Sequence, residues 1–371
     1  MNPIVKYTTD ENDVLSFTLS NTNVSIANSI RRIILSEIDL VVFKPFPYEN
    51  GNCTFYQNST RLNNEILKQR LACIPIHIKD VNTFPINNYI LEVKKENTTD
   101  NTEVLTTEDF QIKDTVTDKY LSKQTVNEIF PPNSYTGHYI DFVRLKPKAT
   151  NEQLGDIISF TCKFSIGNAK EDGMYNAVSC CSYKFTVDTK LRDDALSKIQ
   201  QQWKDEGKNK DEIELESQNW KLLDGMRFVK QNSFDFIIES IGIFTNKEIV
   251  EKACLILIEK FTFFQTLINE DKLLIEPSID TMSNSYVITL ENEDYTIGKT
   301  LEYVLYNKYY ETGLLTFCGF QKIHPHHTHS IIKLAYKNAT DISLIKGNVN
   351  EGIEDIFNIY KQILSQVQKF P

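Results

Sequence analysis

The sequence predicts a mixed fold of helices and strands in which one small domain occurs twice. Each copy begins with a strand and an amphipathic helix, and continues with later strands and a long apolar helix. The first copy is split between residues 14–38 and 234–268, whereas the second runs without interruption over 285–370. Two related halves in one chain indicate a heterodimer fused into a single polypeptide, and the block between the parts of the first half reads as a β-rich insertion.

Length and composition limit the classes of protein that the chain can represent. With 371 residues it exceeds a single compact core, so two or three domains are expected. A hydrophobic content of 41% and an aromatic content of 11% are typical of a globular protein. The formal charge is −10, which disfavours a protein that binds nucleic acid by itself, because phosphate contacts need clustered Lys and Arg.

The seven cysteines are scattered and form no CxxC pair, which disfavours both a disulfide framework and a zinc ribbon. We expect free and mostly buried thiols in a reducing compartment. The first residues lack the apolar core of a signal peptide, and no apolar run approaches the ~20 residues of a membrane span. The sequence therefore predicts a soluble intracellular protein without a membrane partner.

The first helix is expected over residues 24–38, after the strand 14–19 and the capping cluster 20–23. Isoleucines at helical spacing form its apolar face. The opposite face carries Asn28, Arg31 and Arg32. Such a polar face can simply be solvated surface, but arginines on a rigid helix also suit recognition of a partner's carboxylates or backbone carbonyls.

The middle of the chain is predicted to be rich in strands. A short helix over 63–72 is stopped by Pro75, and residues 80–148 alternate polar stretches with short apolar runs. Strong strand candidates follow at 157–166 and 178–187. The charged segment 196–224 predicts a surface helix or a partly disordered excursion.

Two long apolar helices complete the pattern. A capping box formed by Thr245 and Glu248 opens one of them, and the other ends the chain. Between them come a candidate linker, a strand at 286–290, a helix opened by Asp294, and strands at 314–320 and 330–336. The two apolar faces could bury each other, and the residues expected to do so are Leu257, Phe261, Phe264, Ile356, Phe357, Tyr360, Ile363 and Leu364.

Motifs for chemistry are few. His324, His326, His327 and His329 could approach one metal ion, but their spacing matches no helical or zinc-finger site, and a polar turn between strands explains them better. The sequence has no nucleotide-binding glycine loop, no nucleophile motif, and no paired acids near a histidine. We expect no cofactor, no metal, and no catalytic residue in this chain.

Three segments in the first half resemble the α-like subunits of cellular RNA polymerases, namely bacterial α, its archaeal D-type counterpart and the third-largest subunit of polymerase II. They are SNTNVSIANSIRRIILSEI at 20–38, NEILKQRLACIPI at 64–76 and FDFIIESIG at 234–242. The tail is similar to the smaller partner, which is the archaeal L-type polypeptide and its eukaryotic equivalents. There the segments are EDYTIGKTL at 293–301, FCGF at 317–320 and His324-Pro325.

Two departures from the family pattern matter. Tyr295 replaces the histidine that is usual in the smaller partner's motif. The insertion lacks the cysteine cluster that holds zinc or an iron–sulfur centre in some relatives, so no metal is expected there. A single-chain fusion is similar to the polymerase subunit of nucleocytoplasmic large DNA viruses.

The resemblance implies an α+β fold in which two related dimerisation domains pack helix on helix, with a β-rich domain inserted into the first. The implied parts are a split α/D-like domain, the insert, a linker and an L-like domain, at residues 1–44 with 188–268, 45–187, 269–280 and 281–371.

The implied function is a non-catalytic platform on which a multisubunit DNA-directed RNA polymerase assembles during transcription. Its partners would be the largest and second-largest subunits and small zinc-binding subunits, with DNA contacted only through the complex. Asn28, Arg31, Arg32 and Arg70 are expected at the interface with the second-largest subunit. The virion and the host cytoplasm are the expected locations, with the nucleus as an alternative. A DNA-binding transcription factor using the Arg31–Arg32 helix and a metal-dependent hydrolase using the histidine run stay open as alternative functions.

Overall fold

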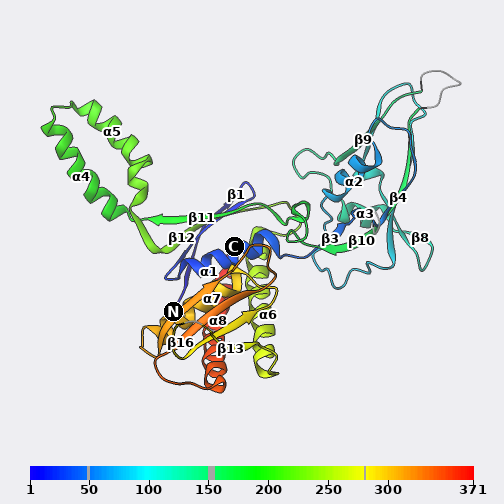
Figure 1. The fold of residues 1–371 in the computed structure, drawn as a ribbon. Coiled ribbons are helices and arrows are strands. Elements are labelled where there is room, and N and C mark those ends of the chain that lie inside the picture. Colours follow the sequence, from blue (N-terminus) through cyan, green and yellow to red (C-terminus); the bar gives the residue numbers. More distant parts are fainter. Residues whose placement is uncertain (48–50, 149–154, 280) are drawn as a thin grey trace. The chain divides into compact units, whose positions relative to one another are not determined.

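The computed structural model describes residues 1–47, 51–148, 155–279 and 281–371 and contains two compact units. Unit 1 consists of Met1–Ile34, Cys180–Glu239 and Asn246–Pro371. Unit 2 consists of Leu35–Ser179 and Ser240–Thr245. Helices and sheets occur in both units, so the chain has an α+β fold (Figure 1).

Unit 1 contains two four-stranded sheets. The strands of the first, in spatial order, are β1 (Ile4–Glu11), β2 (Val14–Ser20), β12 (Val229–Ser240) and β11 (Val178–Val187). The strands of the second are β13 (Ile275–Pro277), β14 (Ser285–Leu290), β16 (Ser330–Tyr336) and β15 (Leu315–Gln321).

A helix follows the second and the fourth strand of each sheet along the chain. In the first half these helices are α1 (Val24–Ser36) and α6 (Asn246–Asn269). In the second half they are α7 (Tyr295–Leu305) and α8 (Ile342–Val367). Both halves therefore share one connectivity. In each sheet the fourth strand along the chain pairs with the second strand, and the third strand lies at the edge. The segment 269–280, expected as a linker, contains β13, which pairs with β14.

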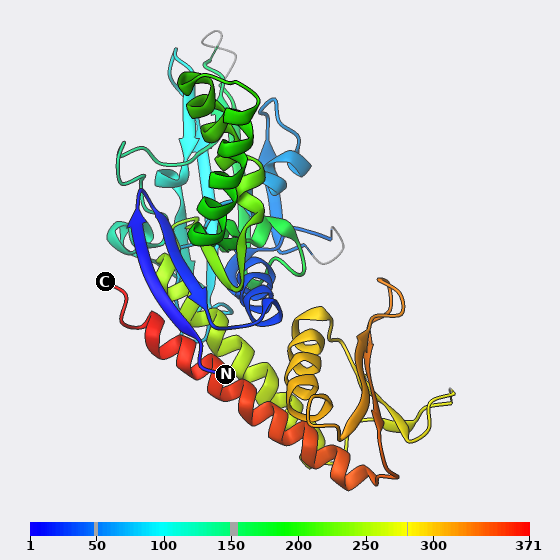
Figure 2. The ribbon, with the colours of Figure 1, turned by 90° about the vertical axis from the view of Figure 1, so that its left-hand side faces the viewer.

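The long helices α6 and α8 lie side by side (Figure 2). Phe261 on α6 stacks on Tyr360 of α8, with ring centroids 6.3 Å apart and planes inclined by 28°. Of the side chains expected between these helices, seven are buried and Leu364 is half-buried; the seven are Leu257, Phe261, Phe264, Ile356, Phe357, Tyr360 and Ile363. Their burial contributes to the stability of unit 1, and the Phe261–Tyr360 pair joins the two halves directly.

Unit 2 is built mostly of strands. One sheet has the order β3 (Leu40–Phe43), β10 (Ile157–Gly167), β5 (Tyr89–Glu96), β7 (Gln111–Asp114) and β8 (Lys119–Tyr120), and β4 (Cys53–Asn58) also pairs with β10. A second, two-stranded sheet joins β6 (Glu103–Thr106) to β9 (Asp141–Leu145). The helices α2 (Asn64–Ala72) and α3 (Lys123–Ile129) complete the unit.

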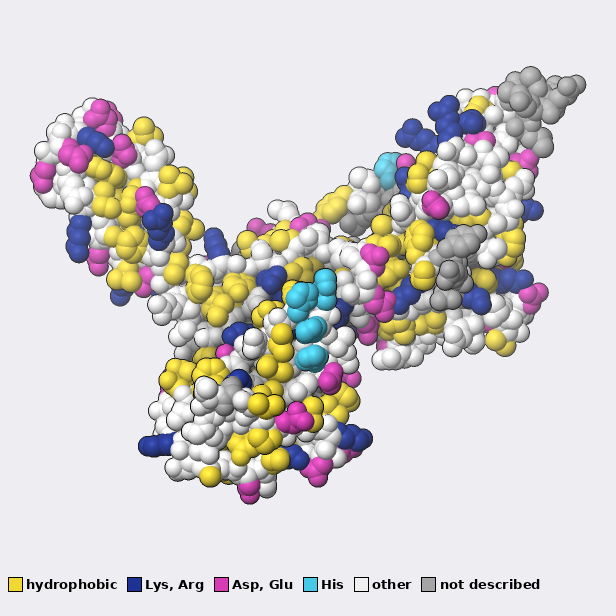
Figure 3. Space-filling model, in the orientation of Figure 1, with side chains coloured by type: hydrophobic (Ala, Val, Ile, Leu, Met, Phe, Trp, Pro, Cys, Tyr) yellow, Lys and Arg dark blue, Asp and Glu magenta, His cyan; other side chains and the backbone are white. Residues whose placement is uncertain are grey.

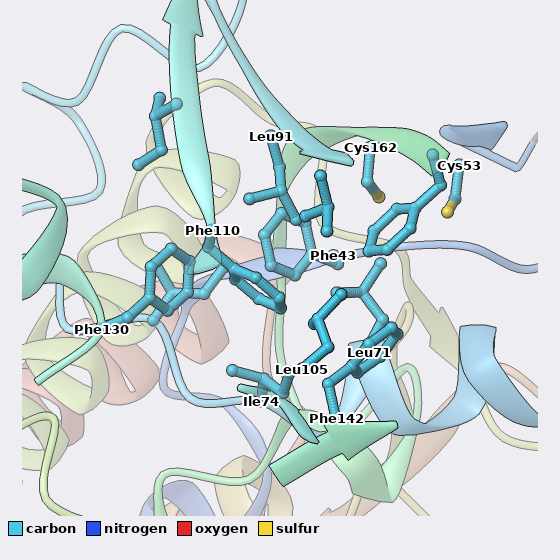
Figure 4. Packing of buried hydrophobic residues seen from close by; sticks show 14 of the residues in the cluster. Phe43, Cys53, Leu71, Ile74, Leu91, Leu105, Phe110, Phe130, Phe142 and Cys162 are labelled. Atoms are coloured by element: carbon cyan, nitrogen blue, oxygen red, sulfur yellow. The ribbon is translucent and has the colours of Figure 1, made fainter. Parts of the chain in front are cut away.

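Aromatic side chains fill the core of unit 2 (Figure 4). Phe110 contacts Phe130 and Phe142 edge-on, at centroid distances of 5.3 Å and 5.9 Å. Such edge-to-face geometry adds to the stability that burial gives. Cys53 and Cys162 face each other across β4 and β10 at the border of this core, and all seven cysteines are free.

The charged segment that connects β11 to β12 along the chain forms two helices, α4 (Thr189–Asp205) and α5 (Lys210–Leu222). The two helices pack against each other as a hairpin. Asp188 caps α4, and Asn209 and Glu212 form a capping box at the start of α5. Of the two structures that the sequence left open for this segment, the helical one is present. Within the described residues, no helix is long and apolar enough to cross a membrane.

Candidate functional site

Helix α1 presents the polar residues that the sequence singled out. Its apolar side chains Ile26, Ile30 and Ile33 are buried in unit 1, which fixes the rotation of the helix about its axis. Asn28 and Arg31 consequently lie on the less buried side. The Nε and Nη2 atoms of Arg31 both donate to Oδ1 of Asn28, at 3.0 and 2.9 Å. The guanidinium is therefore held in one orientation before any partner binds.

Arg31 lies close to strand β11. Burial raises the pKa of the Cys181 thiol to about 12, and the positive charge of Arg31 opposes this rise. Burial also raises the pKa of Tyr183, again against the charge of Arg31. Arg31 is thus a half-buried cation between α1 and β11, in a setting where its charge is less screened than on an open surface.

Arg32 turns toward the second half of the chain. Its Nε donates to Oγ1 of Thr296 at 2.8 Å, and its Nη2 forms an ion pair with Asp294. Asp294 also caps α7, because its Oδ1 accepts the backbone N–H of Thr296 at 2.9 Å. Arg32 therefore joins α1 of the first half to the start of α7 in the second, and a third of each charged side chain stays exposed.

A second polar link between the halves lies deeper. Ser29 Oγ and Tyr360 Oη are 2.7 Å apart, and both residues are buried. Thr300 Oγ1 lies 3.5 Å from the same phenol oxygen. The phenol thus joins α1, α7 and α8 at one point. Sequence reasoning placed Asp294 at the start of a helix but predicted none of these contacts, because the partners of each pair are far apart along the chain.

A comparison with known families bears on these residues. The family model described as the RNA polymerase Rpb3/Rpb11 dimerisation domain matches residues 16–261, which is more than half of the chain. This chain belongs to that family. The match begins in β2 and ends in α6, so it includes α1 with Asn28, Arg31 and Arg32. The chain is an RNA polymerase α-like subunit, and domains of this kind associate with other RNA polymerase subunits.

One curated protein is also similar to part of this α-like subunit. It is a conjugation stage-specific protein of Tetrahymena thermophila, 36% identical over 74 residues. The matched segment covers 20% of this chain and 21% of that protein. The likeness therefore spans about a fifth of either sequence.

Arg70 belongs to unit 2, on helix α2, whereas Asn28, Arg31 and Arg32 lie in unit 1. Its Nη2 donates to the backbone carbonyl of Asp141 at 2.7 Å, which joins α2 to β9. The side chain is exposed apart from this bond. The bond fixes the guanidinium at the surface of unit 2.

The histidine run lies in the turn between β15 and β16 of the α-like subunit (Figure 3). The rings of His324 and His326 are 4.8 Å apart, and those of His327 and His329 are stacked at 5.3 Å. His324 Nδ1 accepts the backbone N–H of His326 at 3.1 Å, so this atom is occupied within the turn. Across the described parts of the chain, no three His, Cys, Asp or Glu side chains form a group that could hold a metal ion.

Substitutions at Asp294 separate its two roles. We expect Asp294→Ala to lower the free energy of unfolding by about 1–2 kcal/mol, because both the cap and the ion pair are lost. Asp294→Asn keeps a capping side chain and loses only the charge, so a loss below about 1 kcal/mol is expected. Urea denaturation measures both values. An equal loss in the two variants would show that the cap contributes nothing.

Proposed function

We propose that this chain is the non-catalytic assembly platform of a multisubunit DNA-directed RNA polymerase. We further propose that its first half corresponds to an α-like subunit and its second half to the smaller partner of that subunit, joined in one polypeptide. The packing of α6 against α8 is the observation that carries this proposal. These helices end two halves of identical connectivity, and each half alone would expose a long apolar face.

Fusion has a physical advantage for such a platform. The segment from Glu270 to Leu274 connects α6 to the first strand of the second sheet. A connection this short holds the two halves at an effective concentration of roughly the millimolar range. Separate subunits would instead pair only to the extent that their concentration in solution exceeds the dissociation constant of the pair.

The partners proposed for this platform are the largest and second-largest polymerase subunits and the small zinc-binding subunits. Arg31 and Asn28 on α1 and Arg70 on α2 are the residues proposed for contact with the second-largest subunit. Arg32 would act through α7, by holding the two halves together. DNA and the nucleotide-adding chemistry would belong to the large subunits.

We also propose a viral origin for the chain, in a nucleocytoplasmic large DNA virus, with the virion and the host cytoplasm as its locations and the nucleus as the alternative. The support is the single-chain arrangement together with a sequence rich in Asn, Ile and Lys. Immunolabelling of infected cells and mass spectrometry of purified particles would test the locations.

Affinity purification of the tagged full chain, followed by mass spectrometry, tests the platform role. The two large polymerase subunits should be recovered in amounts equimolar with the tagged chain. Recovery of the chain alone, or only as copies of itself, would contradict the proposal.

Cutting the chain tests the fusion. We expect residues 1–270 and 271–371, co-expressed as separate chains, to purify as a one-to-one complex, because the cut leaves β13 with its own sheet and the α6–α8 contact intact. Residues 271–371 expressed alone should aggregate, since α8 would expose its apolar face. A soluble, monomeric 271–371 fragment that does not bind 1–270 would refute the fusion.

A further inference from the structure

Unit 2 carries a pocket of about 380 Å³, and Arg70, which is proposed above for contact with the second-largest subunit, is one of the residues that line it. It opens between the region of α2 and the strands β6 and β9. The residues that line it are Arg61, Leu62, Arg70, Val104, Asp141, Phe142, Val143 and Arg144. Figure 3 shows Lys and Arg side chains gathered in the region of unit 2 where Figure 1 labels β9.

The floor of this arginine pocket is apolar and rigid. Phe142 is only 1% exposed and packs against Phe110 and Phe160 in the core of unit 2, at 5.9 and 5.4 Å between ring centroids. Leu62 and Val104 are partly buried beside it. A floor anchored in this way keeps its shape, so a side chain that enters it meets a preformed surface.

The rim is cationic. The sequence contains three arginines within unit 2, and all three line this pocket: Arg61, Arg70 and Arg144. Asp141 is the one acidic residue among the lining residues. In the described part of the chain, neither Arg61 nor Arg144 forms an ion pair, and both are exposed. With three guanidinium groups and one carboxylate, the lining keeps an excess of positive charge, which favours an anionic ligand.

We propose that the arginine pocket binds an acidic segment of a partner polypeptide, whose carboxylates pair with Arg61 and Arg144 and whose neighbouring aromatic or aliphatic side chain fills the apolar floor. A guanidinium matches a carboxylate in a two-pronged hydrogen bond, which favours arginine over lysine for this purpose. The charge of −10 on the whole chain makes this cationic rim a local exception, so complementarity selects an anionic partner.

The same features favour a polypeptide over a nucleic acid. A nucleic-acid strand needs a track of cations along several phosphates, with aromatic faces exposed for stacking. Here the cations surround one hollow, and Phe142 is buried below it. The identification of the partner as another polymerase subunit rests on the proposed function, whereas the chemistry of the ligand rests on the pocket.

A peptide array tests this inference without any other subunit. The array carries 12-residue peptides with one or two Asp or Glu residues and one Phe, Leu or Trp, separated by one to four positions in every combination. Purified, labelled full chain is applied, and the best peptides are measured in solution by fluorescence anisotropy. We expect binding that falls at least tenfold when the acids are replaced by amides, and at least tenfold when the apolar residue is replaced by serine.

Two variants with the same change in net charge separate the pocket from general electrostatics. Arg61→Glu with Arg144→Glu should reduce binding of the selected peptides at least tenfold, whereas Lys94→Glu with Lys119→Glu, at exposed sites elsewhere in unit 2, should change it less than threefold. Circular dichroism confirms that both variants fold. Equal loss in the two variants, no array peptide that prefers the wild-type chain, or a 12-nucleotide RNA that competes as well as the best peptide would each overturn the inference.

The peptide array and the affinity purification test the two proposals separately. Array binding without recovered polymerase subunits would support the pocket and contradict the platform. Recovered subunits without array binding would support the platform and contradict the pocket.

Discussion

Replacement of Phe261 by alanine is expected to lower the free energy of unfolding by about 3–5 kcal/mol. The ring is fully buried on α6 and stacks on Tyr360 of α8, so it contacts the other half of unit 1. Removal of the ring loses its transfer free energy and leaves a cavity that two long, packed helices cannot close. Urea denaturation followed by circular dichroism measures the loss.

Phe263 provides the matched control, because it lies two residues further along the same helix and is 64% exposed. Phe263→Ala should change the free energy of unfolding by less than about 0.5 kcal/mol. A double-mutant cycle with Tyr360→Ala should give a coupling energy of about 0.5–3 kcal/mol, as expected for residues in contact. Strict additivity of the two substitutions would mean that Phe261 and Tyr360 do not stabilise each other.

The second large effect is expected at Arg31. Arg31→Glu should leave the chain folded and reduce recovery of the large polymerase subunits more than tenfold. Asn28 holds the guanidinium by two hydrogen bonds and Cys181 and Tyr183 lie nearby, so the charge is presented rigidly to a partner. Reversal of a charge at such a contact replaces attraction by repulsion, which costs several kcal/mol. Quantitative mass spectrometry of the purified complex measures the effect.

Three comparisons make this result specific. Lys184→Glu, on an exposed position of β11, should leave recovery of the subunits unchanged. Arg31→Lys keeps the charge but loses the forked hydrogen bonding, so an intermediate recovery is expected. Asn28→Ala releases the guanidinium and should reduce recovery less than Arg31→Glu does. Full recovery with Arg31→Glu, in a complex of normal stability, would remove Arg31 from the interface.

Local patterns in the sequence were sufficient for much of the fold. The apolar spacing along α6 and α8 predicted both helices and the side chains that they bury, because one face of a helix repeats every 3.6 residues. The box of Thr245 and Glu248 predicted the start of the first of them, which begins at Asn246. The prediction of an α+β chain is confirmed, and so is the family relationship that the motifs around α1 indicated.

Spacing alone left other segments undecided. Charge without a strong apolar period did not distinguish a helix from disorder at residues 196–224, where capping by Asp188 and Asn209 and packing of α4 on α5 produce a hairpin. The expected linker contains the strand β13, which the sequence did not reveal because three residues are too few to show a period. Only the fold explains why a glycine stands at position 298, because the Phe320 ring occupies the space that a Cβ atom would need.

The sequence by itself determined where the long helices α1, α6, α7 and α8 lie, which of their faces are apolar, and which family the motifs indicate, because these follow from residues that are neighbours along the chain. Only the tertiary structure decided what the arginines contact. Arg32 meets Asp294 across 262 positions, and Arg61 and Arg144 reach one pocket from segments 83 residues apart. Such pairs arise from the closure of long loops, whose geometry depends on the packing of the whole unit and not on any local repeat.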